Sequence, residues 1–406
     1  MAKALGGTQD IQQALVKAPT LQTLWVTRLA TGLGIVVCAL ISLVGTSWDI
    51  QWHLFVGRDR TLIPPHIMML TGITLGGLLA LTAVCVETMV VRRKPQLAQY
   101  STQFAGMFYS SLGTYIAGFA ALDAAIAFPL DSYWHSLYGI DVALWTPFHV
   151  MILVGMGSMP LGAAFMLRSA GQLARVAGQR RGERISALST GVALSLVLSI
   201  FTILLSDALT ITNYLDLGLF KLCLYPLLAG FLTTFILMTA QTAVRGRWSA
   251  TTVILLYIVV GLIFTAFVPP ATSYLVAAEH LQYRRALNAF AFVSILAVRL
   301  WPILPIVLAP IFDLVINRAR RQRWSWRRLH WSSALLGLLA CVPMTVFQLN
   351  SALGVMSRSG LIGTVASLSL GLIGTYIGTA LGRQTGESIQ QGDANQATAS
   401  QQACRG

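Results

Sequence analysis

The chain has 406 residues, of which 55% are hydrophobic and only 10% are charged. A soluble protein of this size would need far more charge to cover its surface. Apolar stretches of about 20 residues, the length that crosses a bilayer, recur along almost the whole sequence. The composition excludes a soluble globular protein and predicts an all-α, polytopic helical membrane protein whose immediate partner is the lipid bilayer.

The formal net charge of +14 is the kind of value that nucleic-acid-binding proteins show. Here, however, the Lys and Arg residues gather in alternate short loops, which is the positive-inside pattern of membrane proteins. The clusters lie at 92–94, 168–184, 245–247 and 318–328. We therefore expect an integral, multi-pass membrane protein with both termini in the cytoplasm, and we expect no nucleic acid among its partners.

The apolar stretches predict ten transmembrane helices. They lie near Leu29–Ser47, His66–Val91, Phe104–Phe128, Pro147–Leu167, Ile185–Ser206, Leu217–Ala240, Ala250–Val268, Leu287–Val315, Ser332–Leu349 and Leu361–Leu381. The chain then divides into a cytoplasmic N-terminal segment (1–28), a duplicated membrane unit (29–167), a basic cytoplasmic linker (168–184), a six-helix membrane region (185–382) and a cytoplasmic tail (383–406). The tail is rich in Gln, Ala, Ser and Gly without an apolar period, which predicts disorder.

The first part of the chain contains a sequence that occurs twice. At one constant offset, Asp49, Trp52, His53, Gly57 and Asp59 correspond to Asp131, Trp134, His135, Gly139 and Asp141. After a one-residue insertion, Pro64, His66, Met68, Leu70 and Gly72 correspond to Pro147, His149, Met151, Leu153 and Gly155. Two membrane crossings per copy preserve orientation. The first four helices are therefore predicted to form two parallel two-helix repeats, related by an axis along the membrane normal.

Each copy contains an Asp, a His four residues later and a second His near the start of the next helix. The candidate metal ligands are Asp49, His53 and His66 in the first copy and Asp131, His135 and His149 in the second. An Asp and a His four apart share one face of a helical turn, and a Pro before the second His is typical of a helix start. Two His and one carboxylate form a common metal-binding set. Because the basic loops are predicted inside, both motif loops are expected on the outer face.

Several alternatives remain open at this level. Asp59 and Asp141 are candidates to orient a histidine ring or to add a fourth ligand. The two copies either share one metal centre or hold two. The motifs also fit a wet interfacial loop, in which Trp48, Trp52, Trp134 and Trp145 form an aromatic belt and the polar groups merely cap helices.

The spacing Asp49-x3-His53-x12-His66, with Trp52 before the first His and Arg58-Asp59 after it, resembles the metal-site motif in a helical membrane subunit of the copper membrane monooxygenases. This family comprises the particulate methane and ammonia monooxygenases. The resemblance implies Asp49, His53 and His66 as copper ligands in a complex that inserts oxygen into a C–H or N–H bond. The second copy follows only through the internal repeat, since thirteen residues separate its histidines and Ile140 replaces the Arg. The tandem copy and six further helices also depart from the family's pattern.

The leading hypothesis is a membrane metal-binding protein, with copper as the favoured ion and iron or zinc as alternatives. As a monooxygenase-like oxidoreductase component it would oxidise a small apolar substrate from the bilayer, with a quinol as reductant and additional membrane subunits as partners. The second hypothesis is a non-enzymatic metal transporter, acquisition protein or assembly factor. Transport predicts further ligands along a path through the membrane, and Asp123 is the one obvious polar group beneath the motifs.

A few other residues carry weaker expectations. Glu87 is predicted to pair near the cytoplasmic basic cluster, and Arg299 to pair within a helix or line a cavity. The pair Glu279-His280 is a weak candidate for a further metal group. Five cysteines are scattered without a CxxC pair, four of them in apolar segments, so a thiolate metal site is not indicated and a buried cysteine is expected to act as a small apolar residue.

Overall fold

The computed structural model describes residues 2–57, 62–139, 146–207, 214–244, 246–284, 303–346 and 354–391. Within these ranges the fold is almost entirely helical, which confirms the all-α prediction. Eight of the described helices are long and apolar enough to cross a membrane. They are α1 (Ala2–Phe55, apolar from Leu21), α2 (Pro64–Arg93), α3 (Leu112–Tyr138), α4 (Pro147–Val176), α5 (Arg180–Asp207), α6 (Tyr225–Val244), α7 (Ser249–Ala278) and α11 (Gly354–Gln391).

The two remaining predicted spans fall partly outside the described residues. In their place the structure has α9 (Ile303–Arg321) and α10 (Trp326–Val346). Residues 285–302, which include Arg299, lie outside the described ranges. An integral, multi-pass membrane protein is therefore supported, with eight spans among the helices that the structure describes.

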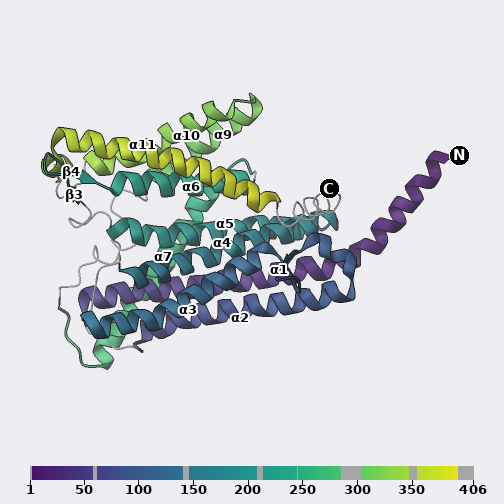
Figure 1. The fold of residues 1–406 in the computed structure, drawn as a ribbon, viewed down its shortest axis with the longest axis horizontal. Coiled ribbons are helices and arrows are strands. Elements are labelled where there is room, and N and C mark those ends of the chain that lie inside the picture. The colour runs from purple at the N-terminus through teal and green to yellow at the C-terminus, as the bar shows by residue number, and fades with distance from the viewer. Residues whose placement is uncertain are drawn as a thin grey trace.

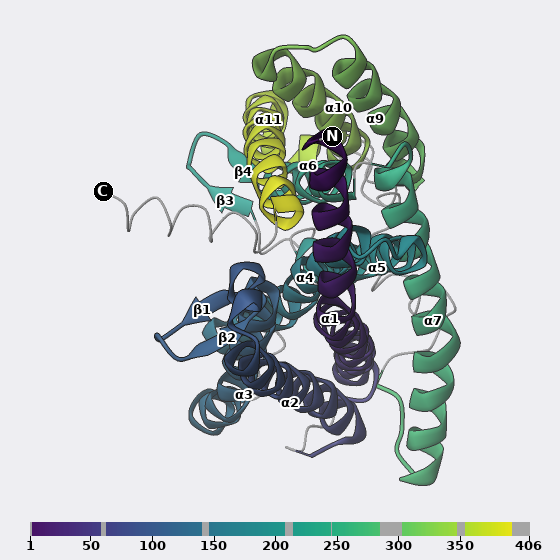
Figure 2. The ribbon, with the colours of Figure 1, turned by 90° about the vertical axis from the view of Figure 1, so that its right-hand side faces the viewer.

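The helices form two packed groups (Figure 1). Helices α1 to α4 run side by side, with α1 against α2 and α4, and α3 between α2 and α4. Helices α6, α9, α10 and α11 form the other group, in which α11 packs along α6. Figure 2 shows α5 and α7 along the side that joins the two groups, and α5 contacts α4, α6 and α7.

Two short hairpins replace parts of predicted helices. The first follows the 3-10 helix η1 (Pro95–Tyr100) and pairs β1 (Thr102–Phe104) with β2 (Phe108–Ser110) in antiparallel register. The second pairs β3 (Tyr214–Asp216) with β4 (Lys221–Cys223). The predicted starts of the third and sixth helices were therefore too early. Helix α3 begins only at Leu112, where Ser111 Oγ accepts a hydrogen bond from Thr114 N at 3.2 Å and caps the helix.

Four predicted helix ends need correction because the helices continue through polar sequence. Helix α1 extends to Phe55 and α3 to Tyr138, so the Asp and first His of each motif lie on helices and not in loops. Helix α4 runs through residues 168–176 of the predicted linker, where Arg168 is buried. Residues 383–391 of the predicted disordered tail continue α11, where a Cβ added at Gly386 would lie 2.8 Å from Thr239 O of α6 and Ile389 is fully buried. The tail beyond Gln391 lies outside the described residues.

Glycines let the first four helices approach closely, at positions that correspond in the two sequence copies. A Cβ added at Gly72 would lie 2.5 Å from Cys38 O and 2.6 Å from Ser42 N of α1. A Cβ added at Gly155 would lie 2.6 Å from Ala120 O and 2.9 Å from Ala124 N of α3. The offset of the repeat relates Cys38 to Ala120 and Ser42 to Ala124, so the two glycine contacts correspond to each other. The second helix of each copy thus packs onto the first through the same contact.

Replacing Gly72 by Ala is expected to destabilise the protein by about 1–3 kcal/mol, because the new methyl group would meet backbone atoms that cannot yield without separating α1 from α2. The matched control is Gly261→Ala in α7, where an added Cβ meets nothing within 4 Å and helix propensity favours Ala. Thermal unfolding in detergent measures both. Equal stability of the two variants would contradict the tight contact.

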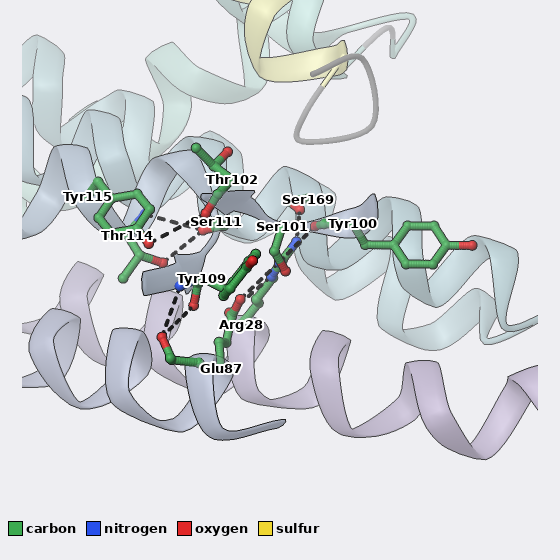
Figure 3. A network of polar contacts seen from close by, with 11 residues as sticks. Arg28, Glu87, Tyr100, Ser101, Thr102, Tyr109, Ser111, Thr114, Tyr115 and Ser169 are labelled. Atoms are coloured by element: carbon green, nitrogen blue, oxygen red, sulfur yellow. Dashed lines mark hydrogen bonds and ion pairs between the residues drawn. The ribbon is translucent and has the colours of Figure 1, made fainter. Parts of the chain in front are cut away.

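A buried polar network lies at the other end of α1 from the Asp/His motif (Figure 3). Arg28 Nε and Nη2 donate to the Glu87 carboxylate at 3.0 and 2.9 Å, and both side chains are at most 1% exposed. The same guanidinium donates to Ser169 Oγ on α4, Tyr100 O and Ser101 Oγ. Glu87 therefore pairs with Arg28 of α1, and not with the basic cluster at 92–94 that follows it in sequence. The network ties α1, α2 and α4 to the segment before the first hairpin.

Candidate metal centres

The three candidate ligands of the first copy converge at one end of the α1–α2 pair. Asp49 and His53 lie on the last two turns of α1, and His66 is the third residue of α2. Asp49 Oδ1 is 2.9 Å from His66 Nε2 and 3.4 Å from His53 Nε2. The side chains are 12–19% exposed. We call this group triad 1.

The second copy forms the same arrangement, which we call triad 2. Asp131 and His135 lie on the last two turns of α3, and His149 is the third residue of α4. Asp131 Oδ2 is 3.3 Å from both His135 Nε2 and His149 Nε2. In each triad, one ligand atom per residue lies within 4.8 Å of the other two, so each triad can hold a metal ion.

Local sequence sets this geometry in the same way in both triads. The i, i+4 spacing brings Asp and His to one face at the end of a helix. Each first helix is followed by a glycine with positive φ, Gly57 at +71° and Gly139 at +84°. This left-handed conformation ends a helix readily only at glycine. Each second helix starts with proline, Pro64 or Pro147, which sets φ for the first turn.

The structure pairs each carboxylate with the two histidines of its own copy. Among the described residues, the ligand atoms form two separate groups and no single shared centre. The triads lie on neighbouring helices, since α2 contacts α3, and Phe128 of α3 packs edge-on against the His66 ring at 5.4 Å between centroids. The candidate ligands that the sequence indicated therefore lie in two separate groups.

Apolar side chains surround triad 1. Trp52 is 1% exposed and packs with Val56, Ile63 and Val276 of α7. Trp48 is also buried and meets Phe267 of α7 edge-on at 5.7 Å. These two tryptophans face the protein interior and not lipid, which disfavours an aromatic belt at the first motif.

The segment after α7 also packs beside triad 1. The backbone N–H of Arg284 donates to Phe55 O at 2.7 Å, at the end of α1. The Arg284 side chain lies over Gly57, where an added Cβ would collide with its guanidinium. Sequence reasoning missed both this neighbour and Phe128. Phe128 had a signal, because it lies one turn before Asp131, whereas nothing in the spacing links Arg284 to the motif.

The donor set of triad 2 fits a metal ion. His135 Nδ1 is 3.1 Å from Gly139 O, and a carbonyl oxygen only accepts, so Nδ1 carries the hydrogen. The neutral ring then presents its Nε2 lone pair to the Asp131 carboxylate. Two facing lone pairs repel unless a cation, or an additional proton on the ring, lies between them. A metal ion supplies that positive charge to the carboxylate and both histidines at once.

Asp131 also keeps an oxygen without a hydrogen-bond donor. Asp131 Oδ1 is buried and has no hydrogen-bond partner among the described residues, whereas Asp49 Oδ1 lies 2.9 Å from His66 Nε2. A buried carboxylate oxygen without a donor is costly, and coordination of a cation removes that cost. Three protein ligands also leave coordination positions open for water or a substrate.

The remaining candidates contribute less. Asp59 and Asp141 lie outside the described residues. Asp123 is half-buried on α3 and joins no metal-binding group with other described residues. Glu279 and His280 are exposed at the end of α7 and likewise join no such group there. No protein-family model, curated protein or solved structure matches the chain.

Proposed function

We propose that this chain is an integral membrane metalloprotein that binds one copper ion in each triad. The observation that carries the proposal is the convergence of two histidine nitrogens and one carboxylate oxygen within 4.8 Å, in two separate groups. An isolated Asp/His cluster is common at protein surfaces. Two groups built alike, at corresponding ends of two helix pairs, favour a shared chemical task over chance.

Copper is proposed for its ligands and for the resemblance of the first motif. Imidazole nitrogen suits copper, iron and zinc, and two histidines with one carboxylate also serve non-haem iron. The spacing of Asp49, His53 and His66 resembles that of the copper membrane monooxygenases, which favours copper. Bound copper with open positions would supply redox chemistry toward oxygen. The chain's own part is to hold the ion, orient His135 through Gly139 O and exclude water through Trp48 and Trp52.

The first form of this function is a monooxygenase-like component that oxidises a small apolar substrate. Phe128 beside His66, and Trp48 with Phe267, make one side of triad 1 apolar. A substrate that partitions from the bilayer fits such surroundings better than a charged one. The reaction also needs an external reductant, for which a quinol is proposed, and additional membrane subunits.

The second form is a non-enzymatic copper handler, a transporter or an assembly protein. It is favoured by buried sulfur-bearing side chains, among them Met156 and Cys38, in the core beneath the triads. For both forms we propose that the two helix pairs are parallel repeats, supported by the corresponding contacts of Gly72 and Gly155. The basic loops are proposed to be cytoplasmic, with both triads on the outer face.

Metal analysis of the purified protein tests the proposal. Wild type is expected to bind about two equivalents of copper, and His53→Ala and His135→Ala about one each, because each loses a ligand of one triad. The control is His280→Asn, an exposed position with φ +52° that Asn tolerates and that belongs to neither triad. Metal content that is low, or unchanged by both His→Ala variants, would remove the proposed function.

Spectroscopy separates the two forms. An electron paramagnetic resonance signal of bound copper that disappears on reduction and returns with oxygen would favour the oxygenase component. Zinc as the bound ion would count against the oxygenase component, because zinc has no redox chemistry.

A further inference from the structure

Buried sulfur-bearing side chains are spaced along the core of the first four helices, beginning below the triads. Met156, Met159 and Met166 lie on one face of α4, each at most 1% exposed, and Cys38 of α1 is 5% exposed. The spacing of the three methionines, three and then seven residues, keeps them on one side of α4, and Met156 and Met166 meet α1 there. The triads and these sulfur atoms therefore belong to the same bundle.

The first of these three methionines lies at the contact between α4 and α1. Met156 is two helical turns below His149, and its Sδ is 3.3 Å from Thr46 Oγ1 of α1. Thr46 is one turn below Asp49. From the helical rise, Met156 is about 10 Å below His149 along α4.

The next two sulfur-bearing side chains both lie next to Gly76 of α2. A Cβ added at Gly76 of α2 would lie 2.7 Å from Met159 Sδ and 3.5 Å from Cys38 Cβ. Because Gly76 has no side chain, the thioether extends between α1 and α2 at the level of Cys38. The helical rise places Cys38 and Met159 at similar depths, about 15 Å below Asp49 and His149 respectively.

The lowest sulfur lies near the polar network at the opposite end. A Cβ added at Gly32 of α1 would lie 3.4 Å from Met166 Sδ. Gly32 is one turn from Arg28, and Met166 is three residues before Ser169, both members of the Arg28–Glu87 network. The sulfur side chains thus extend from the triads to the polar groups at the other end of the same helices.

We propose that these side chains form a path of soft ligands for Cu(I) through the four-helix unit, with Cys38 and Met159 as its central binding site. Thioether and thiolate sulfur favour Cu(I) over harder cations. Cys38 would bind as the thiolate, its proton passing to bulk water, so that the Cu(I)–thiolate pair carries no net charge in the apolar core. The proposal rests on the proposed function for the source of copper and specifies the handler form of it.

The alternative is that these methionines only fill the core, since Met is a common core residue. The variant Met159→Leu separates the two roles, because it keeps the apolar volume and removes the sulfur. The matched control is Met238→Leu, in α6 and 1% exposed, away from the path. Thermal unfolding in detergent is expected to be the same for both variants, which shows that each folds.

The test uses full-length protein loaded with Cu(I) under anaerobic, reducing conditions. X-ray absorption of wild type is expected to show sulfur neighbours of copper in addition to nitrogen and oxygen. The double variant Cys38→Ala Met159→Leu is expected to lose the sulfur neighbours and keep about two equivalents on nitrogen and oxygen. Protein in lipid vesicles is expected to take up Cu(I), and Met159→Leu to lower the rate at least tenfold while Met238→Leu leaves it unchanged.

The outcomes separate this proposal from the proposed function. Copper bound only through nitrogen and oxygen, with no uptake that depends on Met159, would overturn the sulfur path and leave the triads in place. Sulfur-bound copper that persists after substitution of both triads, with no triad copper in wild type, would overturn the proposed function and retain the path. Equal effects of Met159→Leu and Met238→Leu would show that the methionines act through packing alone.

Discussion

Removal of bound metal is expected to lower the free energy of unfolding of the wild-type protein substantially. An ion that binds the folded state alone stabilises it by about 2.7 kcal/mol at roughly 100 times its Kd, so two occupied triads contribute about 5 kcal/mol. The physical cause is the relief of a buried carboxylate that otherwise faces two ring nitrogens without a compensating cation. Thermal unfolding in detergent, with copper and then with excess chelator, measures the difference.

Asparagine variants assign this stabilisation to the two triads. Asp49→Asn and Asp131→Asn keep the side-chain shape and remove the negative charge, so each is expected to lose about half of the copper-dependent shift. The double variant is expected to show none, while its stability in chelator stays close to that of wild type. A copper-dependent shift that survives in the double variant would place the stabilising ion elsewhere in the protein.

Substitution of Arg28 by Ala is expected to cost about 3–5 kcal/mol, because it removes the bidentate Arg28 partner from the buried Glu87 carboxylate among three packed helices. Ser169, Tyr100 and Ser101 would lose a hydrogen-bond donor in the same step. Thermal unfolding in detergent measures the loss. Copper content is expected to remain at the wild-type value, since Arg28 lies about 30 Å along α1 from Asp49.

The double variant Arg28→Leu Glu87→Leu tests the reason for that cost. Replacing both members of a buried ion pair with apolar residues is often close to neutral, so the double variant is expected to recover most of the stability that Arg28→Ala loses. If the double variant is as unstable as the single one, the Arg28–Glu87 ion pair would contribute more to stability than the two leucines that replace it.

Much of each candidate site could be predicted from local sequence. The i, i+4 relation of Asp49 and His53 depends only on helix geometry, and the prolines before His66 and His149 mark helix starts that the structure has. The ends of the helices were harder to place. Asp49 and His53 were assigned to a loop because polar residues interrupt the apolar stretch, yet packing of Trp52 against α7 keeps this part of α1 helical and buried.

The membrane class, the two ligand sets and their equivalent positions were determined by the sequence itself, because hydropathy and helical periodicity are local properties. Only the tertiary structure decided that each carboxylate closes onto the histidines of its own copy, and that Phe128 and Arg284 lie beside the first triad. The tertiary structure also places Met159 and Cys38 next to the same residue, Gly76. Such contacts depend on how the helices pack. The same hydropathy pattern is compatible with many different arrangements of neighbouring helices.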